Sequence, residues 1–328
     1  MIEAFQQLPP AFFIGFLTLL GLLVGSFLNV VIYRLPKMMD KEQEEAAAEF
    51  IEQKISQKES VDFIPLESTC PQCHHHFAWS KGIAVSPEKA DSAKKPAFNL
   101  MTPGSSCPKC GHKIRWWENV PVLSWLFLRG RCSSCRTPIS ARYPAVELLT
   151  GILFGFVAWR LGTGWEAFLW CFFVAMCVAI SGIDWDTTWL PDELSLSLMW
   201  AGIIFAALGW VPLSLTSAVW GAVAGYMFLW TIATLFKVLM GKIAMANGDF
   251  KLFAALGAWF GWEWLLPIIL VSSAVGAIVG ILLKVMQSKA GLFEGKYVPF
   301  GPFLAGAGLL ILLVTPQTIR QAFPFLFF

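Results

Sequence analysis

Long apolar segments alternate with short polar segments over most of this 328-residue chain. Apolar runs of about 17 to 25 residues have the length that an α-helix needs to cross the hydrocarbon core of a bilayer. The runs predict eight helices, near residues 11–33, 144–160, 166–183, 194–210, 214–236, 252–265, 267–286 and 302–319. The sixth run is short. A single helix broken at Gly261 and Pro267 would replace the sixth and seventh, and would leave seven spans.

The composition of the chain agrees with this pattern. Hydrophobic residues make up 56% of the chain, charged residues make up 14%, and the mean hydropathy is +0.62. An ordinary soluble domain does not have this composition. We therefore expect an all-α polytopic membrane protein with about eight transmembrane helices. We expect no nucleic-acid partner, since a formal net charge of +2 comes without a clustered basic face.

One polar region, residues 34–143, is long enough to fold outside the membrane. Within it, residues 40–58 are rich in Lys, Glu, Gln and Ala and predict a surface helix, whereas residues 87–103 predict a flexible insert. The expected organisation is a first transmembrane helix over residues 1–33, a soluble domain over 34–143 and a transmembrane core over 144–328. The first helix should be uncleaved, because no basic segment precedes it.

The distribution of Lys and Arg predicts how the chain is oriented. If residues 34–143 face the cytoplasm, the alternation of eight spans places about 22 of the 24 basic residues inside and leaves Arg160 and Arg320 outside. The long polar region counts for less in this argument, because the positive-inside rule weakens beyond about 60 residues. In this orientation Asp184 and Asp249 both lie at the cytoplasmic ends of predicted helices.

Six of the eight cysteines form three Cys-x-x-Cys pairs, Cys70 with Cys73, Cys107 with Cys110, and Cys132 with Cys135. The second and third pairs are about 21 residues apart, a spacing typical of a zinc ribbon. We expect Cys107, Cys110, Cys132 and Cys135 to hold one structural Zn²⁺ in the cytoplasmic domain. Structural disulfides are the alternative, and the reducing side of the membrane disfavours them.

The first cysteine pair resembles a partial copy of the second. The segment CPQCHHHFAW contains Cys70 and Cys73, and CPKCGHKIRW contains the second pair. One zinc ion needs only four of the six thiolates. Cys70 and Cys73 either form a second site with His74, His75 or His76, or bind no metal.

Acidic residues at the ends of two apolar runs form the second candidate site. Asp184 follows the run at 166–183, and Asp249, in the segment MANGDFK, precedes the run at 252–265. Two close carboxyl groups can share one proton, so that one takes a proton from water while the other gives a proton to a peptide carbonyl. The alternative is that the acids after residue 183 only form a hydrated loop, in which Asp192 caps the next helix.

Six segments, taken together and in this order, resemble the type IV prepilin peptidases, which are aspartic proteases of the bacterial inner membrane with a GxGD motif. They are GSFLNVVIYRLP at 25–36, CPKCGHKIRWWENVPVLSWLFLRGRCSSC at 107–135, ISARYPAVELLTG at 139–151, IDWDTTWLPDELS at 183–195, GDFKLFAALGAWFGW at 248–262 and VPFGPFLAGAG at 298–308. The resemblance covers most of the chain.

The resemblance implies that Asp184 and Asp249 are the catalytic pair of a multi-pass peptidase in the inner membrane, within the core at 144–328. The GxGD motif is altered here, since Ala246 stands in place of its first glycine. The resemblance also implies cleavage of the basic leader peptide from type IV prepilins and related pseudopilins at the cytoplasmic face. Methylation of the new N-terminus by S-adenosylmethionine would follow. No glycine-rich nucleotide motif is visible, so we predict no residues that bind this cofactor.

Two other classes of protein stay open at this stage. A proton- or cation-coupled transporter would use Asp184, Asp249 and Glu147 as an ion path, and it predicts acids near the bilayer midplane and inverted repeats. A zinc-ribbon scaffold for secretion machinery would explain the cysteines but not the acids. Glu147 itself has two interpretations, an ion pair with Arg142 or a part in methyl transfer.

Overall fold

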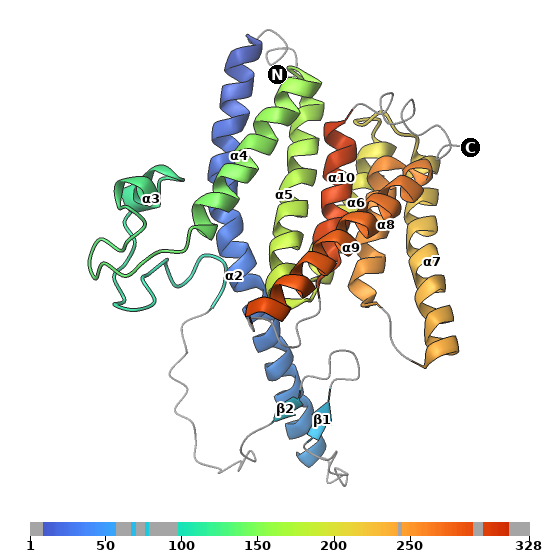
Figure 1. Ribbon diagram of the computed structural model, residues 1–328, viewed down its shortest axis with the longest axis horizontal. Coiled ribbons are helices and arrows are strands. Elements are labelled where there is room, and N and C mark those ends of the chain that lie inside the picture. The colour runs from blue at the N-terminus through green and yellow to red at the C-terminus, as the bar shows by residue number, and fades with distance from the viewer. Residues whose placement is uncertain are drawn as a thin grey trace. The chain divides into compact units, whose positions relative to one another are not determined.

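The computed structural model describes residues 9–56, 67–69, 76–78, 98–241, 245–290 and 298–314. In these residues the chain is mostly helical (Figure 1). It divides into two compact units, one formed by residues 1–33 and 105–328 and the other by residues 34–104.

In the described part of the chain, each predicted apolar run corresponds to one helix. These helices are α2 (Pro10–Ser56), α4 (Arg142–Leu161), α5 (Trp165–Thr187), α6 (Asp192–Ala207), α7 (Leu215–Met240), α8 (Asn247–Phe260), α9 (Leu265–Ala290) and α10 (Gly301–Leu313). Five helical segments are long and apolar enough to cross a membrane: Pro10–Ala47, Arg142–Leu161, Trp165–Thr187, Leu215–Met240 and Trp262–Val285. In its described residues the protein is thus a helical membrane protein with five candidate spanning helices. Helices α6 and α10 are shorter than the predicted spans at 194–210 and 302–319, whereas α8 is as long as the run at 252–265 but begins five residues earlier.

One boundary differs from the sequence-based expectation. The surface helix expected over 40–58 is the continuation of α2, which runs without interruption to Ser56. The sixth and seventh runs form separate helices, as the prediction of eight helices expects, and not the single broken helix that was its alternative. Gly261 ends α8 with φ +84°, and a short 3₁₀ turn, η2 (Trp262–Trp264), precedes α9.

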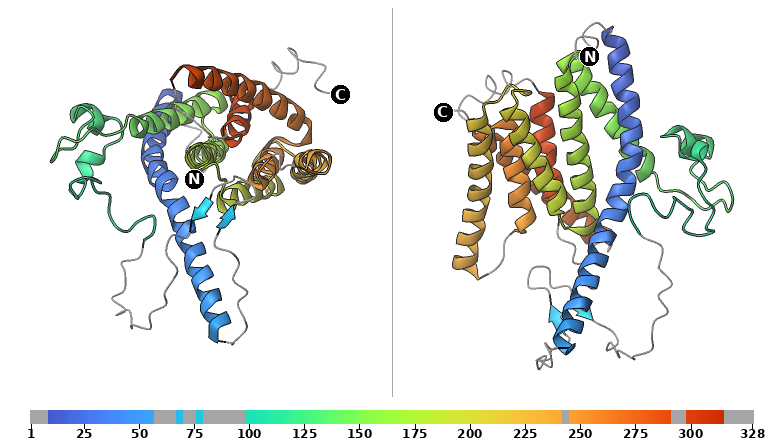
Figure 2. Two further views of the ribbon diagram at one scale, coloured as in Figure 1. Left: turned by 60° about the horizontal axis from the view of Figure 1, so that its bottom comes forward. Right: turned by 180° about the vertical axis from the view of Figure 1, so that it is seen from behind.

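In the first unit, α5 is the most enclosed of the candidate spanning helices (Figure 2). Phe173, Cys177 and Ile180 on this helix are fully buried. Helices α7 and α8 approach closely, because a Cβ atom on Gly221 would lie 2.1 Å from the carbonyl oxygen of Gly257. Small residues at such crossings let helix backbones touch, which is a common way to pack helices in lipid.

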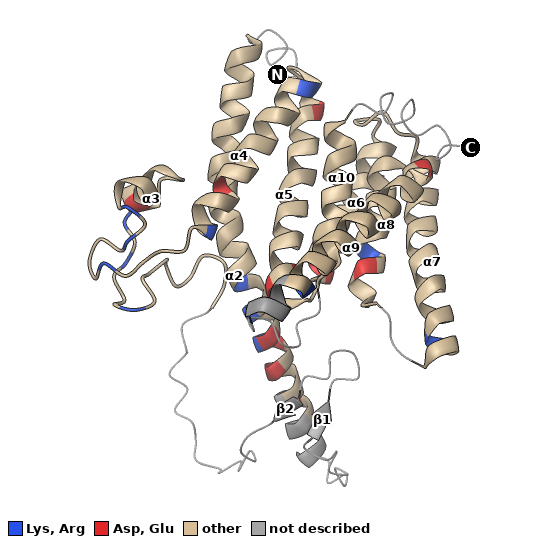
Figure 3. Ribbon diagram, viewed as in Figure 1, with Lys and Arg blue, Asp and Glu red and all other residues tan. Residues whose placement is uncertain are grey.

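Charged residues on the helices of this unit lie mainly toward the helix ends (Figure 3). Many large apolar side chains on α4, α7 and α9 are exposed, as expected for surfaces that face lipid. Ionisable groups that are nevertheless buried among helices need a partner or a function. Asp184, Asp249 and Glu147 are such groups.

The first unit also contains a segment between α2 and α4 that has little regular secondary structure. Two short helices, η1 (Trp116–Asn119) and α3 (Leu123–Phe127), lie between isolated β-bridges that join Ser106 to Lys113 and Arg131 to Pro138. This arrangement places the cysteine pairs at residues 107–110 and 132–135 on two facing turns.

The second unit contains a small antiparallel pair of strands, β1 (Glu67–Thr69) and β2 (His76–Ala78). Arg34 is buried in this unit, where its guanidinium donates hydrogen bonds to the carbonyl oxygens of Asn99 at 3.0 Å and Pro103 at 2.7 Å. Cys70, Cys73, His74 and His75 lie outside the described residues, and so does the side chain of His76.

Candidate active site and metal centre

Asp184 lies in the last turn of α5 and is only 4% exposed. Its Oδ2 atom accepts a hydrogen bond of 2.9 Å from the backbone N–H of Gly301, the first residue of α10. The N–H groups of a first helical turn have no partner inside the helix, so a carboxylate there is stabilised. A Cβ atom at position 301 would lie 2.6 Å from Asp184 Oδ2. A side chain at this position would therefore displace the carboxylate.

Asp249 lies in the first turn of α8 and is 6% exposed. The residue before it, Gly248, packs so closely on Leu190 that a Cβ atom would lie 2.6 Å from the Cβ of that leucine. Ala246, which replaces the first glycine of the motif, is the N-cap residue and has φ −78°. This φ value is ordinary for any residue, so the alanine fits the turn without strain.

Leu190 connects the two acid-bearing segments. It is buried in the loop between α5 and α6, and its Cδ2 atom would lie 3.2 Å from a Cβ atom at Gly301, in addition to its contact with Gly248. Asp184 and Asp249 are close enough for their carboxyl groups to interact electrostatically. Sequence reasoning missed Leu190 and the role of Gly301, although both lie in segments that it had singled out.

The neighbouring acids have basic partners. Arg142 Nη1 lies 2.6 Å and 2.7 Å from the two carboxylate oxygens of Asp186, and Lys251 forms an ion pair with Asp192. Among the residues that the structure describes, neither Asp184 nor Asp249 forms an ion pair with Lys or Arg. In the described residues, these two acids thus differ from Asp186 and Asp192 in burial and in lacking a basic partner.

Glu147 does not pair with Arg142, whose guanidinium binds Asp186 and donates to the carbonyl oxygen of Gly182 at 3.2 Å. Instead, Glu147 Oε2 accepts a hydrogen bond of 2.7 Å from the backbone N–H of Val122. Of its two sequence-based interpretations, the ion pair with Arg142 is therefore wrong. The bond joins α4 directly to the start of α3.

An apolar cavity of about 370 Å³ lies between α7, α9 and the start of α10. Leu229, Met245, Ile269, Phe300 and Phe303 are among its lining residues. Phe300 directly precedes Gly301, which binds Asp184. The cavity could therefore hold an apolar side chain close to a peptide bond at the acid pair.

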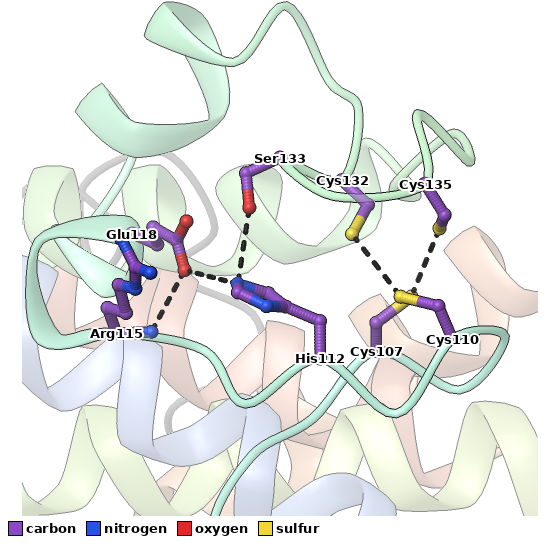
Figure 4. Close-up of polar contacts among 8 residues, drawn as sticks. All are labelled: Cys107, Cys110, His112, Arg115, Glu118, Cys132, Ser133 and Cys135. Carbon is purple, nitrogen blue, oxygen red and sulfur yellow. Dashed lines mark hydrogen bonds and ion pairs between the residues drawn. The ribbon is translucent and has the colours of Figure 1, made fainter.

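The four expected cysteines come together (Figure 4). The sulfur atoms of Cys107 and Cys135 are 3.8 Å apart, those of Cys110 and Cys132 are 4.0 Å apart, and all four lie within 4.8 Å of one another. Thiolates about 2.3 Å from a tetrahedral ion are separated by similar distances. The four cysteines can therefore hold a metal ion with four sulfur ligands.

A second polar cluster supports one of the two cysteine turns (Figure 4). Glu118 Oε2 lies 2.9 Å from the backbone N–H of Arg115 and 3.1 Å from His112 Nε2, which is also 3.2 Å from Ser133 Oγ. The Arg115 N–H and the polar groups of Ser133 and His112 lower the pKa of Glu118 to about 2. Glu118 is thus ionised at neutral pH. Its partner His112 also contacts Ser133, which connects the turn of Cys107 and Cys110 to the turn of Cys132 and Cys135.

Comparison with known proteins places this architecture in a class of membrane peptidases. The bacterial peptidase A24 N-terminal domain matches residues 19–86 and 90–161, and the type IV leader peptidase family matches residues 171–281. The chain belongs to the type IV leader peptidase family, as its motifs indicated. This membership leaves the transporter alternative without support.

Several relatives match over nearly their whole length. A prepilin leader peptidase/N-methyltransferase of Stutzerimonas stutzeri is 45% identical over 314 residues, which cover 95% of this chain and 94% of the relative. Proteins of the same name from Neisseria gonorrhoeae and Pseudomonas aeruginosa are both 42% identical. The matched residues make up 92% of this chain and 90% of the Neisseria protein. For the Pseudomonas protein they make up 96% of this chain and 95% of the relative. No solved structure matches the chain.

Proposed function

We propose that this protein cleaves the basic leader peptide from type IV prepilins and related pseudopilins, and then methylates the new N-terminal residue. One observation carries the proposal: in a chain of this family, two buried acids converge around Leu190, and neither forms an ion pair with a Lys or Arg of the described residues. The names of the relatives support both activities. A scaffold protein would leave the buried acids without a role.

Asp184 and Asp249 perform the hydrolysis in this proposal. The two carboxyl groups share one proton, so that the ionised group takes a proton from water and the protonated group donates to the carbonyl oxygen of the scissile peptide bond. The hydroxide adds to the carbonyl carbon, and the tetrahedral intermediate then breaks its C–N bond while the amine takes up a proton. The N–H of Gly301 fixes the orientation of Asp184 during these steps.

The substrate binds with its basic leader in the cytoplasm and its apolar helix in the bilayer. The acids lie at the helix ends that the Lys and Arg distribution assigns to the cytoplasmic side of the inner membrane. The cavity beside Gly301 accepts an apolar side chain near the cleavage site. In this topology α2 and α4–α10 provide eight membrane crossings, the shorter helices α6, α8 and α10 included.

Residues 34–143 form the cytoplasmic part, in which Cys107, Cys110, Cys132 and Cys135 hold one Zn²⁺ in a ribbon-like arrangement. The sulfur separations suit this ion. With four sulfur ligands the zinc stabilises the fold and has no open position for catalysis. S-adenosylmethionine supplies the methyl group when it is bound, and the described residues contain no glycine-rich nucleotide motif for it.

The test is a reaction of the purified membrane protein with a prepilin, read out as product masses. Without S-adenosylmethionine we expect a pilin that has lost its leader, and with it we expect the same pilin carrying one extra methyl group. Uncut prepilin in both reactions would contradict the proposal. Cleavage without methylation would contradict only its second half.

A further inference from the structure

The segment of residues 105–141, which we call the ribbon segment, has an apolar surface that the proposed chemistry does not use. Leu123, Leu126 and Phe127 are exposed, and their spacing places them on one face of α3. Phe127 is 83% exposed. Trp125 lies on the other side, where its Nε1 donates to the carbonyl oxygen of Ile139 at 3.2 Å. The helix is therefore attached through Trp125, and no described part of the chain covers its apolar face.

The hydrogen bond between Glu147 and Val122 sets the level of this face along α4. Helix α4 has 20 residues, which give a length of about 30 Å, close to the thickness of the hydrocarbon core. Glu147 lies five residues after Arg142, so its Cα atom is about 7.5 Å inside the end of α4, and its carboxylate holds the start of α3 beside these first turns. Figures 1 and 2 show α3 beside the first turns of α4 rather than beyond its end. An apolar helix face that lies in a membrane interface is typically immersed to a depth of about 5–10 Å.

The charge of the ribbon segment fits an anionic surface. The segment has six basic residues, Lys109, Lys113, Arg115, Arg129, Arg131 and Arg136, all of them exposed. Glu118 is its only acidic residue, and the Arg115 N–H and His112 bind that carboxylate. Basic residues next to an inserted apolar face strengthen binding to anionic lipids.

Exposed tryptophans of the ribbon segment also indicate a lipid surface as its partner. Trp116 and Trp117 on η1 are exposed, and the Arg115 guanidinium lies 5.3 Å from the centre of the Trp117 ring. Tryptophan is enriched at the boundary between lipid and water. A basic prepilin leader would be repelled by this segment, so it is a poor candidate for the uncovered face.

We propose that the ribbon segment binds the anionic phospholipid surface at the end of α4 where that helix begins. Leu123, Leu126 and Phe127 insert between acyl chains, and the basic side chains contact lipid headgroups. This lipid contact is independent of the peptidase activity. It would hold the metal-binding turns at a fixed level beside the bilayer.

The proposal can be tested by photo-cross-linking of the full-length protein in vesicles. Benzoylphenylalanine replaces Phe127 or, as a matched control, the exposed Ser134 beside the metal-binding cysteines. The vesicles contain phosphatidylglycerol with a tagged acyl chain. We expect severalfold more lipid adduct at position 127 than at position 134. We also expect a severalfold loss at 127 when phosphatidylcholine replaces phosphatidylglycerol at equal tag content.

Other outcomes would overturn the proposal. Equal lipid adduct at positions 127 and 134 would show that α3 is not inserted. Equal adduct at 127 in the two lipids would remove the role of anionic headgroups. Cross-links from 127 to a co-reconstituted prepilin in place of lipid would assign the face to substrate. The metal content of both variants, measured on the same samples, verifies that the ribbon segment is folded.

Discussion

Asp184 and Asp186 are two residues apart on α5 but have different surroundings. Asp186 is partly exposed and is bound by Arg142, whereas Asp184 is buried against the N–H of Gly301. The local sequence could single out the acids because each stands at the edge of an apolar run, within a segment that resembles a motif of the family. It could not indicate Leu190 or Gly301, since their importance comes from contacts with residues far away in the chain.

We predict that Asp184→Asn and Asp249→Asn each reduce leader cleavage on the order of a thousandfold, because an amide cannot exchange the proton in acid–base catalysis. Asp186→Asn is the matched control. It should keep most of the activity, since it loses only a partly exposed ion pair, worth less than about 1 kcal/mol. Cleavage rates of a prepilin in proteoliposomes check this, and near-normal cleavage by either of the first two variants would refute the assignment.

We predict a large effect from one methyl group at position 301. In Gly301→Ala the new Cβ would lie 2.6 Å from Asp184 Oδ2, so the carboxylate must move. Displacement of a catalytic group by about 1 Å can cost about a hundredfold in rate. Gly306→Ala, in the same helix, is the control because nothing lies within 4 Å of its Cβ position. Equal cleavage rates for the two variants would show that the contact of Gly301 with Asp184 is unimportant.

At the level of elements, the hydrophobic pattern located every long helix of the described residues but not its length. Helix α2 extends to Ser56 through the boundary expected at residue 33, because the polar residues that follow are themselves good helix formers. Helices α6 and α10 are shorter than their apolar runs, and α8 begins and ends five residues before its run. Helix ends depend on turns such as that at Gly261, which hydropathy does not detect. The cysteine spacing, by contrast, predicted the four-sulfur cluster because two tight turns leave few ways to arrange the thiols.

We predict that the purified protein contains about one tightly bound zinc ion. Cys107→Ser should release it and destabilise the ribbon segment, because in such sites the free energy of metal binding is free energy of folding. Acidification should also release the ion, since protons compete with zinc for the thiolates as the pH falls. Metal analysis after reductive purification measures both effects.

Cys70→Ser provides the control for that measurement. If the ion is held by the other four cysteines, this variant should retain it. A metal-free wild-type protein would contradict the assignment. Two zinc ions per chain, one of them lost in Cys70→Ser, would instead indicate a second site.

At the level of the whole molecule, a hydrogen bond connects the ribbon segment to α4, and an ion pair connects the region of the acid pair to the same helix. Glu147 on α4 binds Val122 in the ribbon segment, and Arg142, one and a half turns earlier, binds Asp186 next to Asp184. The sequence suggested a pair between Glu147 and Arg142 because they are close in the chain. In the fold, each residue instead binds another segment, which local spacing cannot indicate.

Our last prediction is that cleavage and methylation can be separated by position. Cleavage needs Asp184 and Asp249 among the membrane helices, whereas methylation must bring a charged, soluble cofactor to an amine that forms only after cleavage. We therefore expect Glu147→Ala, which leaves the Val122 N–H without its acceptor, to reduce methylation more than cleavage. Cys107→Ser should act in the same direction by loosening the ribbon segment. Mass spectrometry of the pilin product should find cleaved, unmethylated chains, after expression and membrane insertion have been verified. If both variants methylate at the normal rate every chain that they cleave, the two activities do not divide in this way.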